Sequence, residues 1–197
     1  MFPVANDTRL ILASASPRRR YLLKQAGLQF EVIPSTVDET GMTAAAPENH
    51  VRALAEAKAA DIARAHPQAW VIGADTVVVI EGRLLGKPAD TDQARRMLNR
   101  LSGQRHHVYT GYAIFCLARD RHISATVTTE VEFKSLSPDE IEWYLQTGEP
   151  FDKAGAYAIQ GIGTFLVRRI NGSYTSVVGL PVCEVIEVLI REGVVVR

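Results

Sequence analysis

The hydrophobic pattern of the chain changes period several times, and each period predicts one kind of element. Short apolar or alternating runs predict strands at residues 10–13, 30–33, 71–74 (continuing extended to 80), 107–117, 122–133, 165–170 and 174–178. Apolar positions spaced three and four apart predict helices at residues 18–26, 47–66 and 91–101, with two more that begin at Ser137-Pro138 and at Pro181. Because helices and strands alternate, with hairpins among them, we expect an α/β fold with a mixed, twisted sheet and flanking helices.

Turn and cap residues sharpen several of these boundaries. Ser16-Pro17 predicts a helix start, with serine as the cap and proline in the first turn, and residues 137–140 form a capping box. Glu81-Gly82 and Asn171-Gly172 both predict hairpin turns. The second turn is expected to join the strands at 165–170 and 174–178.

Composition narrows the class of protein. The chain has 197 residues, of which 47% are apolar, enough for one domain with a real core. Its 22 basic and 22 acidic side chains balance, which argues against a nucleic-acid-binding protein. No apolar run approaches the roughly 18 residues of a membrane helix. Cys116 and Cys183 cannot make a disulfide framework and are expected to be small buried apolar residues. A cytoplasmic location is therefore expected.

Positive charge gathers where the first predicted strand passes into a helix. Ser14, Ser16, Arg18 and Arg19 lie at this junction. The free N–H groups and positive dipole of a helix N-terminus bind anions, and serine hydroxyls and guanidinium groups add donors. A well-capped helix with solvated arginines is the alternative. Arginines in a first helical turn are repelled by the positive end of the helix dipole unless an anion lies there. Their presence therefore favours an anion site.

Carboxylates occur at two places that suit metal or water chemistry. Asp75 follows an apolar run and is expected at a strand end, where α/β proteins gather ligands. Asp38 and Glu39 lie in a long loop. Such carboxylates can hold Mg²⁺ or orient a water molecule. The alternatives are a turn aspartate and a solvated loop.

Two lysines and one amide complete the candidate chemistry. Lys87 follows a glycine on a stiff loop, and Lys58 lies on a mostly apolar helix. Either can bind a phosphate, although Lys58 can also be a surface lysine whose stem covers apolar neighbours. Gln160 lies in a glycine-rich segment and can pair with a base edge, or the segment can be a tight connection only. Together these groups predict metal-assisted attack on a nucleotide phosphate.

At these residues the chain resembles the Maf-like nucleoside triphosphate pyrophosphatases. The matching segments run in order from about Leu10 to Leu189. They are residues 12–19, Glu39, residues 57–59, 73–76, 86–88, 152–161, 170–174 and 178–181. Several motifs in the same order are far more specific than any single one.

The resemblance implies a fold, a reaction and a setting. The fold would be the Maf/inosine-triphosphatase-like α/β fold, a single domain over residues 1–197 with two lobes around a central cleft. The reaction would be hydrolysis of a nucleoside triphosphate to the monophosphate and pyrophosphate, with Mg²⁺ or Mn²⁺ assisting water attack at the α-phosphate. Family members are typically cytoplasmic, often homodimeric, and clear unwanted nucleotides. The balanced charge and the lack of a long apolar run predict no nucleic-acid or membrane partner.

The resemblance also implies residue roles. Asp75 matches the catalytic carboxylate and Glu39 its acidic partner, and both are candidate metal ligands. The predicted phosphate clamp comprises Arg18, Lys58 and Lys87, with Ser14 and Arg19 beside it.

Thr76 and Gln160 resemble the dTTP/UTP subfamily, since the 7-methyl-GTP branch typically carries glutamine and glutamate at these positions. Arg18 matches the third position that sets specificity. A glutamine amide both donates and accepts, as a uracil or thymine edge requires. The alternatives are a 7-methyl-GTP or broader modified-nucleotide pyrophosphatase, and a nucleotide-sensing regulator of cell division or septum formation.

Overall fold

The structure is a computed structural model that describes residues 3–5, 8–39 and 46–196. The chain forms two compact units. Unit 1 comprises Met1–Asp75, Thr110–Val127 and Gly179–Arg197, and unit 2 comprises Thr76–Tyr109 and Thr128–Val178. The single domain with two lobes around a cleft stays a prediction.

The strands form one mixed seven-stranded sheet. They are β1 (Leu10–Leu12), β2 (Glu31–Val32), β3 (Trp70–Ile80), β4 (Arg83–Leu85), β5 (Arg105–Cys116), β6 (Arg121–Phe133) and β7 (Val167–Asn171). The order is β2-β1-β3-β5-β6-β7, and β4 pairs with β3. β1 runs parallel to β2 and β3, whereas the β3–β4 and β6–β7 pairs are antiparallel. The expected mixed α/β sheet is confirmed.

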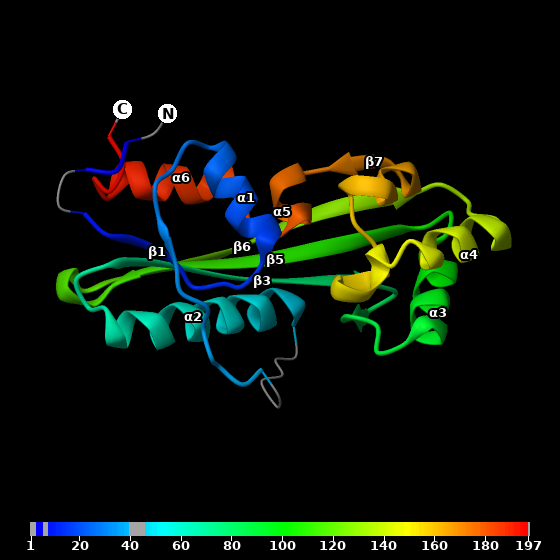
Figure 1. Cartoon of the computed structure of the whole chain (residues 1–197), viewed down its shortest axis with the longest axis horizontal. Coiled ribbons are helices and arrows are strands. Elements are labelled where there is room, and N and C mark those ends of the chain that lie inside the picture. The colour runs from blue at the N-terminus through cyan, green and yellow to red at the C-terminus, as the bar shows by residue number, and fades with distance from the viewer. Residues whose placement is uncertain (1–2, 6–7, 40–45, 197) are drawn as a thin grey trace. The chain divides into compact units, whose positions relative to one another are not determined.

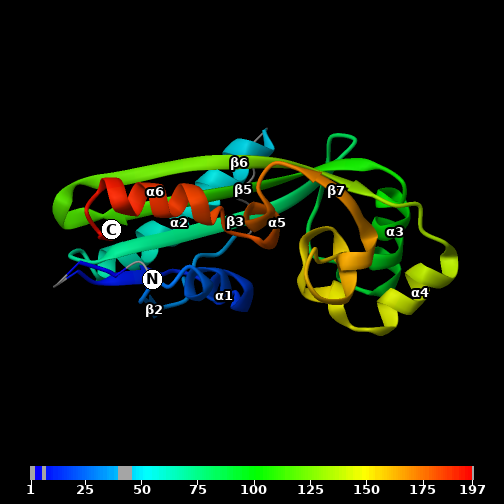
Figure 2. The ribbon, with the colours of Figure 1, turned by 90° about the horizontal axis from the view of Figure 1, so that it is seen from above.

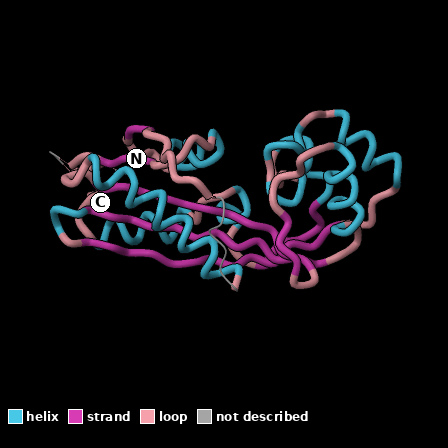
Figure 3. The backbone as a smooth tube through the Cα atoms, turned by 90° about the horizontal axis from the view of Figure 1, so that it is seen from below, coloured by secondary structure: helices cyan, strands magenta, loops and turns pink. Residues whose placement is uncertain are grey.

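In unit 1, helices cover both faces of the strands. α1 (Pro17–Gln25) and α6 (Val182–Arg191) lie on one face, and α2 (Pro47–Ala65) lies on the other (Figures 1 and 2). Figure 3 shows α2 running across the strands. The contact is close, because a Cβ at Gly73 would lie 2.2 Å from the carbonyl oxygen of Ala55. Glycine at this position therefore lets β3 and the backbone of α2 approach each other.

Unit 2 has its own apolar core. It is built from α3 (Thr91–Leu101), α4 (Pro138–Gln146) and the adjoining parts of β3–β7. Buried residues of this core include Val78, Leu98, Phe133, Tyr144 and Leu166. Between α4 and β7 the chain makes three short 3₁₀ turns, η2 (Glu149–Asp152), η3 (Ala154–Ala156) and η4 (Gly161–Leu166). This glycine-rich segment is irregular, as its sequence predicts.

Local signals located most helix ends correctly. Ser16 caps α1 by accepting from the N–H of Arg19, and the capping box at Ser137 and Glu140 is present at α4. Glu81 and Gly82 both have positive φ and form the expected β3–β4 hairpin. These predictions succeed because each depends on hydrogen bonds within four residues.

The strand predicted at 174–178 is wrong, since these residues form helix α5 (Tyr174–Val178). Ser173 begins the helix: its hydroxyl accepts from the N–H of Ser176 at 3.2 Å, and its carbonyl accepts from Val177 at 3.3 Å. The N–H of Ser173 is held by the hydroxyl of Thr129 on β6, at 3.0 Å. A contact with a distant strand thus turns the chain after Gly172 into a helix instead of a hairpin.

The cysteines divide between two environments. Cys116 is buried as expected, whereas Cys183 is exposed on α6, so the second expectation is wrong. Both are free thiols. Within residues 3–5, 8–39 and 46–196, no helix has both the length and the apolar character that crossing a membrane requires.

Candidate active site

The turn from β1 into α1 forms a network of donors around Ser14. The buried Ser14 hydroxyl accepts from the N–H of Ser16 and from a guanidinium N–H of Arg19, both at 3.2 Å. Arg19 also donates from Nε to the carbonyl of Gly179 at 2.7 Å. Arg18 follows in the first helical turn and is half-buried. The structure therefore brings Ser14, Arg18 and Arg19 together at a helix N-terminus, as the sequence predicts.

Arg19 is held in an enclosed and charged environment. Burial lowers the pKa of its guanidinium from the usual value. The nearby carboxylates of Asp75 and Glu39 raise this pKa in turn, while the positive charge of Arg18 lowers it. These mutual influences place Arg18, Arg19, Asp75 and Glu39 in one electrostatic neighbourhood.

Lys58 connects the two predicted catalytic carboxylates. Its Nζ lies 2.8 Å from Oδ1 of Asp75 and 2.8 Å from Oε1 of Glu39. The side chains of Lys58 and Asp75 are each 12% exposed, whereas that of Glu39 is 54% exposed. Lys58 is therefore no solvated surface lysine, and one carboxylate of the pair is enclosed while the other is open to solvent.

Packing and a loop anchor hold this cluster. The close approach of β3 to α2 at Gly73 puts Lys58 within reach of Asp75. The loop that carries Glu39 is tied to α2 by Asp61, whose carboxylate accepts from the hydroxyl of Ser35 and the N–H of Thr36, both at 2.9 Å. These hydrogen bonds lower the pKa of Asp61. Lys58 and the anchor of the Glu39 loop thus belong to the same helix.

Asp75 lies in the middle of a strand, so its expected place at a strand end is wrong. β3 continues to Ile80 because its last residues pair with β4. The strand end in question belongs to β1, which stops pairing with β3 at Leu12–Ile72 and turns away through Ser14. The rule that ligands bind at the carboxyl ends of strands therefore applies to β1. Asp75 lies on the longer neighbouring strand β3, just beyond the position at which β1 ends.

The remaining predicted residues, Lys87, Thr76 and Gln160, belong to unit 2. Lys87 is exposed on the loop after β4, and Thr76 and Gln160 are half-buried. The N–H of Gly155 donates to the carbonyl of Gly86 at 3.0 Å, so the loop of Lys87 lies beside the glycine-rich segment that carries Gln160. Within this unit, two distant motifs of the sequence become neighbours.

The donor set of the carboxylate pair fits a hard divalent cation. Carboxylate oxygens suit Mg²⁺ and Mn²⁺, and Mg²⁺ is commonly held by one or two carboxylates together with substrate phosphates. Among the residues that the structure describes, no three His, Cys, Asp or Glu side chains gather as a metal site. Glu39 and Asp75 thus fit a metal ion that shares its coordination with a substrate, not one that is enclosed by protein alone.

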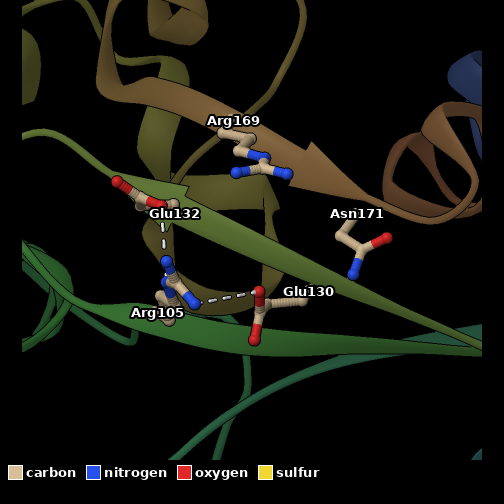
Figure 4. A pocket seen from close by; sticks show the side chains of 5 residues that line it. All are labelled: Arg105, Glu130, Glu132, Arg169 and Asn171. Carbon is tan, nitrogen blue, oxygen red and sulfur yellow. Dashed lines mark ion pairs between the residues drawn. The ribbon is translucent and has the colours of Figure 1, made fainter.

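A separate polar pocket lies on the sheet of unit 2 (Figure 4). Arg105, Glu130, Glu132, Arg169 and Asn171 line it. Arg105 pairs with Glu132 at 3.3 Å and with Glu130 at 3.7 Å. Its acidic and basic side chains balance in number, so it lacks the excess positive charge that a triphosphate requires.

Sequence reasoning missed two residues that organise the segments carrying predicted site residues. Asp61 anchors the Glu39 loop, and Glu149 accepts hydrogen bonds from the segment that follows Gln160. Each is a single acidic residue among many, separated from its backbone N–H partners by 13 residues or more. The only available hint for Glu149 is that it directly follows the glycine that ends α4.

Comparison with known proteins places this sequence in a family. The family model for "Maf-like protein" matches residues 9–192. The chain is 53% identical over 188 residues to a dTTP/UTP pyrophosphatase of Geotalea uraniireducens, covering 95% of this chain and 97% of that protein. It is 53% identical over 181 residues to the protein of that name from Syntrophus aciditrophicus, covering 92% and 88%. A third, from Myxococcus xanthus, is 50% identical over 189 residues, covering 96% and 95%.

A solved HAM1 protein from Coxiella burnetii is a more distant match, with a TM-score of 0.42, 16% identity, and coverage of 64% of this chain and 73% of that one. The family assignment rests on the sequence matches alone, and the range matched by the family model spans the positions of all predicted site residues. The chain belongs to the Maf-like protein family.

Proposed function

We propose that this chain hydrolyses dTTP and UTP to the monophosphate and pyrophosphate. The observation that carries the proposal is the contact of Lys58 with both Asp75 and Glu39 at 2.8 Å, beside the anion-binding turn of Ser14, Arg18 and Arg19. Relatives that share about half of their residues with this chain bear the name dTTP/UTP pyrophosphatase. Both lines of support point to the same reaction.

The cations of the site would bind the triphosphate. Lys58 has three N–H donors and, among the residues that the structure describes, directs two of them to carboxylates, so that the third can bind a phosphate oxygen. The Ser14 oxygen accepts in both of its contacts with described residues, so its proton can be donated to the substrate. Arg18, Arg19 and Lys87 add charge that matches the roughly four negative charges of a triphosphate.

Asp75 is the carboxylate we assign to the attacking water. It is the more enclosed of the two, and so holds a water in a more fixed position than Glu39 can. Water attacks the α-phosphorus, its proton passes to Asp75, and the bond to the bridging oxygen breaks to release pyrophosphate. Mg²⁺ or Mn²⁺, held by Glu39 and Asp75 with phosphate oxygens, would polarise the phosphoryl group.

Release of pyrophosphate from a panel of nucleotides tests the proposal. We expect turnover of dTTP and UTP with Mg²⁺ or Mn²⁺, and little turnover of 7-methyl-GTP. Asp75→Asn should lower kcat by about 10²–10⁴-fold, the usual effect of losing a general base. Asp120→Asn is the matched control, because Asp120 is 99% exposed and has the positive φ that asparagine also tolerates.

Two other outcomes of the nucleotide panel would favour the alternative functions. Preference for 7-methyl-GTP would favour the modified-nucleotide alternative. A folded protein that binds UTP without hydrolysing it would contradict the catalytic role of Asp75 and favour a nucleotide-sensing regulator of division.

The proposal extends to the setting of the enzyme. We propose a cytoplasmic protein that acts on free nucleotides as a homodimer, with no nucleic-acid or membrane partner. The balance of 22 basic and 22 acidic residues supports the absence of a nucleic-acid partner, and the two free thiols suit a reducing compartment. The homodimer is proposed from the family resemblance. Light scattering of the purified protein would measure the dimer directly.

A further inference from the structure

The carboxylate of Glu149, at the start of η2, is surrounded by hydrogen-bond donors of its own unit. Oε1 accepts from the hydroxyl of Tyr144 and from the N–H of Gly163, both at 2.9 Å. Oε2 accepts from the N–H of Ile162 at 3.0 Å. One side chain thus ties the end of α4 to the segment that follows Gln160.

Tyr144 extends this network to the other side of Gln160. Its ring is buried in the core of unit 2, and its hydroxyl accepts from the N–H of Ala158 at 3.2 Å while it donates to Glu149. Burial is the main cause that raises the pKa of this phenol, so it keeps its proton and remains a donor. Gln160 therefore lies between two anchored points, Ala158 on one side and Ile162–Gly163 on the other.

Steric fit shows that this segment is closely packed at Gly163. A Cβ at Gly163 would lie 2.4 Å from the carbonyl oxygen of Ala158 and 2.7 Å from the hydroxyl of Tyr144. Real side chains do not approach so closely, so the backbone here closes tightly around the tyrosine and the glutamate. The conformation that carries Gln160 depends on these contacts.

The chemistry of the network specifically requires a carboxylate. All three partners of Glu149 are donors, and an ionised carboxylate is acceptor-only. A glutamine would turn an NH₂ group toward at least one of these donors and lose that bond. Lys153, nearby in sequence, binds the backbone carbonyl of Glu149 and pairs with Asp152. The role of the Glu149 side chain is therefore to hold the Tyr144 hydroxyl and two backbone N–H groups.

We propose that Glu149, with Tyr144, is a positioning residue that sets pyrimidine selectivity by holding Gln160 in the conformation that recognises the base. This inference rests on the proposed function. Glu149 acts through Gln160 and need not touch the substrate, so its loss should weaken base recognition and leave the phosphate chemistry of unit 1 intact.

Steady-state kinetics with UTP, dTTP and a purine nucleotide such as GTP tests the proposal. Glu149→Gln should raise KM for UTP and dTTP about tenfold, change kcat by less than about threefold, and lower the preference for pyrimidines over GTP. Tyr144→Phe keeps the buried ring but loses both hydroxyl bonds, and should act in the same direction with a smaller effect. Glu81→Gln, at an exposed turn of the same unit, is the matched control.

A double-mutant cycle separates positioning from a general structural role. If Glu149 acts through Gln160, Glu149→Gln should have almost no further effect on KM in a Gln160→Ala background. Independent, multiplicative effects of the two changes, or a fall in kcat with unchanged selectivity, would overturn the proposal.

Calorimetric binding of UTP keeps the inference testable if the proposed function fails. A wild-type protein that turns over neither UTP nor dTTP would contradict the hydrolase assignment alone. Weaker UTP binding by Glu149→Gln, with binding by Glu81→Gln unchanged, would still support the positioning role, and equal binding by all three proteins would refute it.

Discussion

Two regions of this protein are centred on carboxylates, and they use them in opposite ways. In unit 1, Asp75 and Glu39 share the ammonium of Lys58. In unit 2, Glu149 binds a hydroxyl and two backbone N–H groups, all uncharged. The first arrangement joins charged side-chain ends, which can exchange partners when a phosphate or a cation arrives. The second ties a carboxylate to the backbone and so fixes the shape of a segment.

The difference suggests a division of labour within one chain. Charged groups that can change partners suit the reacting end of a substrate, where charge develops in the transition state and must be compensated. A neutral, fully bonded network suits recognition of a base, which requires donors and acceptors held at constant positions. Changing one region should therefore alter catalysis, and changing the other should alter selectivity and stability.

The largest effect is expected from breaking the charged region at Lys58. Lys58→Met removes the cation shared by the two carboxylates and one candidate phosphate ligand, so kcat/KM for UTP should fall by about 10²-fold or more. Steady-state kinetics measures this loss. Lys24→Met, at an exposed position in the last turn of α1, serves as the control. Activity of Lys58→Met within about threefold of wild type would mean that Lys58 is only a structural partner of Asp75.

A smaller effect, on stability, is expected from crowding the fixed region. Gly163→Ala forces a Cβ against the carbonyl of Ala158 and the hydroxyl of Tyr144, and should lower the free energy of unfolding by about 1–3 kcal/mol. Urea denaturation measures the change. Gly86→Ala is the matched control, because its Cβ would meet no atom within 4 Å. Equal stability of the two variants would show that the segment around Gln160 yields more easily than its contacts indicate.

The smallest effect is expected in the pH dependence of stability, through a buried histidine of unit 2. Burial lowers the pKa of His106 from 6.5 to about 3, and its Nε2 lies 2.8 Å from the hydroxyl of Tyr157. Between these pH values the unfolded chain binds a proton that the folded chain does not, so stability falls as the pH is lowered from 6.5 toward 3. From pH 7 to 5.5 the loss should be about 1 kcal/mol.

Urea denaturation at the two pH values, on His106→Phe and on the exposed neighbour His107→Phe, measures this contribution. Only the first variant should lose the pH-dependent part. In unit 1, Asp61 behaves differently, since its pKa is lowered from 3.8 and its stabilising effect disappears only as the pH falls below that value. A wild-type slope that both histidine variants retain would assign the pH dependence to other groups.

Much of the candidate site could be predicted from the sequence because its residues lie in short motifs. Ser14, Arg18, Arg19, Lys58 and Asp75 are found together in unit 1, as the resemblance implies. The roles of Glu149 and Asp61 could not be predicted, because each depends on backbone N–H groups supplied from elsewhere in the chain.

The sequence by itself determined the elements whose signals are local: the caps of α1 and α4, the β3–β4 turn, the long helix α2, and the chemical groups available to the site. Only the tertiary structure decided which of these groups meet. It placed Asp75 inside a strand, made residues 174–178 a helix, and joined Arg19 to Gly179 across 160 positions of sequence. The physical reason is the sequence separation of the interacting groups. Capping bonds form within a few residues, whereas the contacts of a packed core depend on the whole chain.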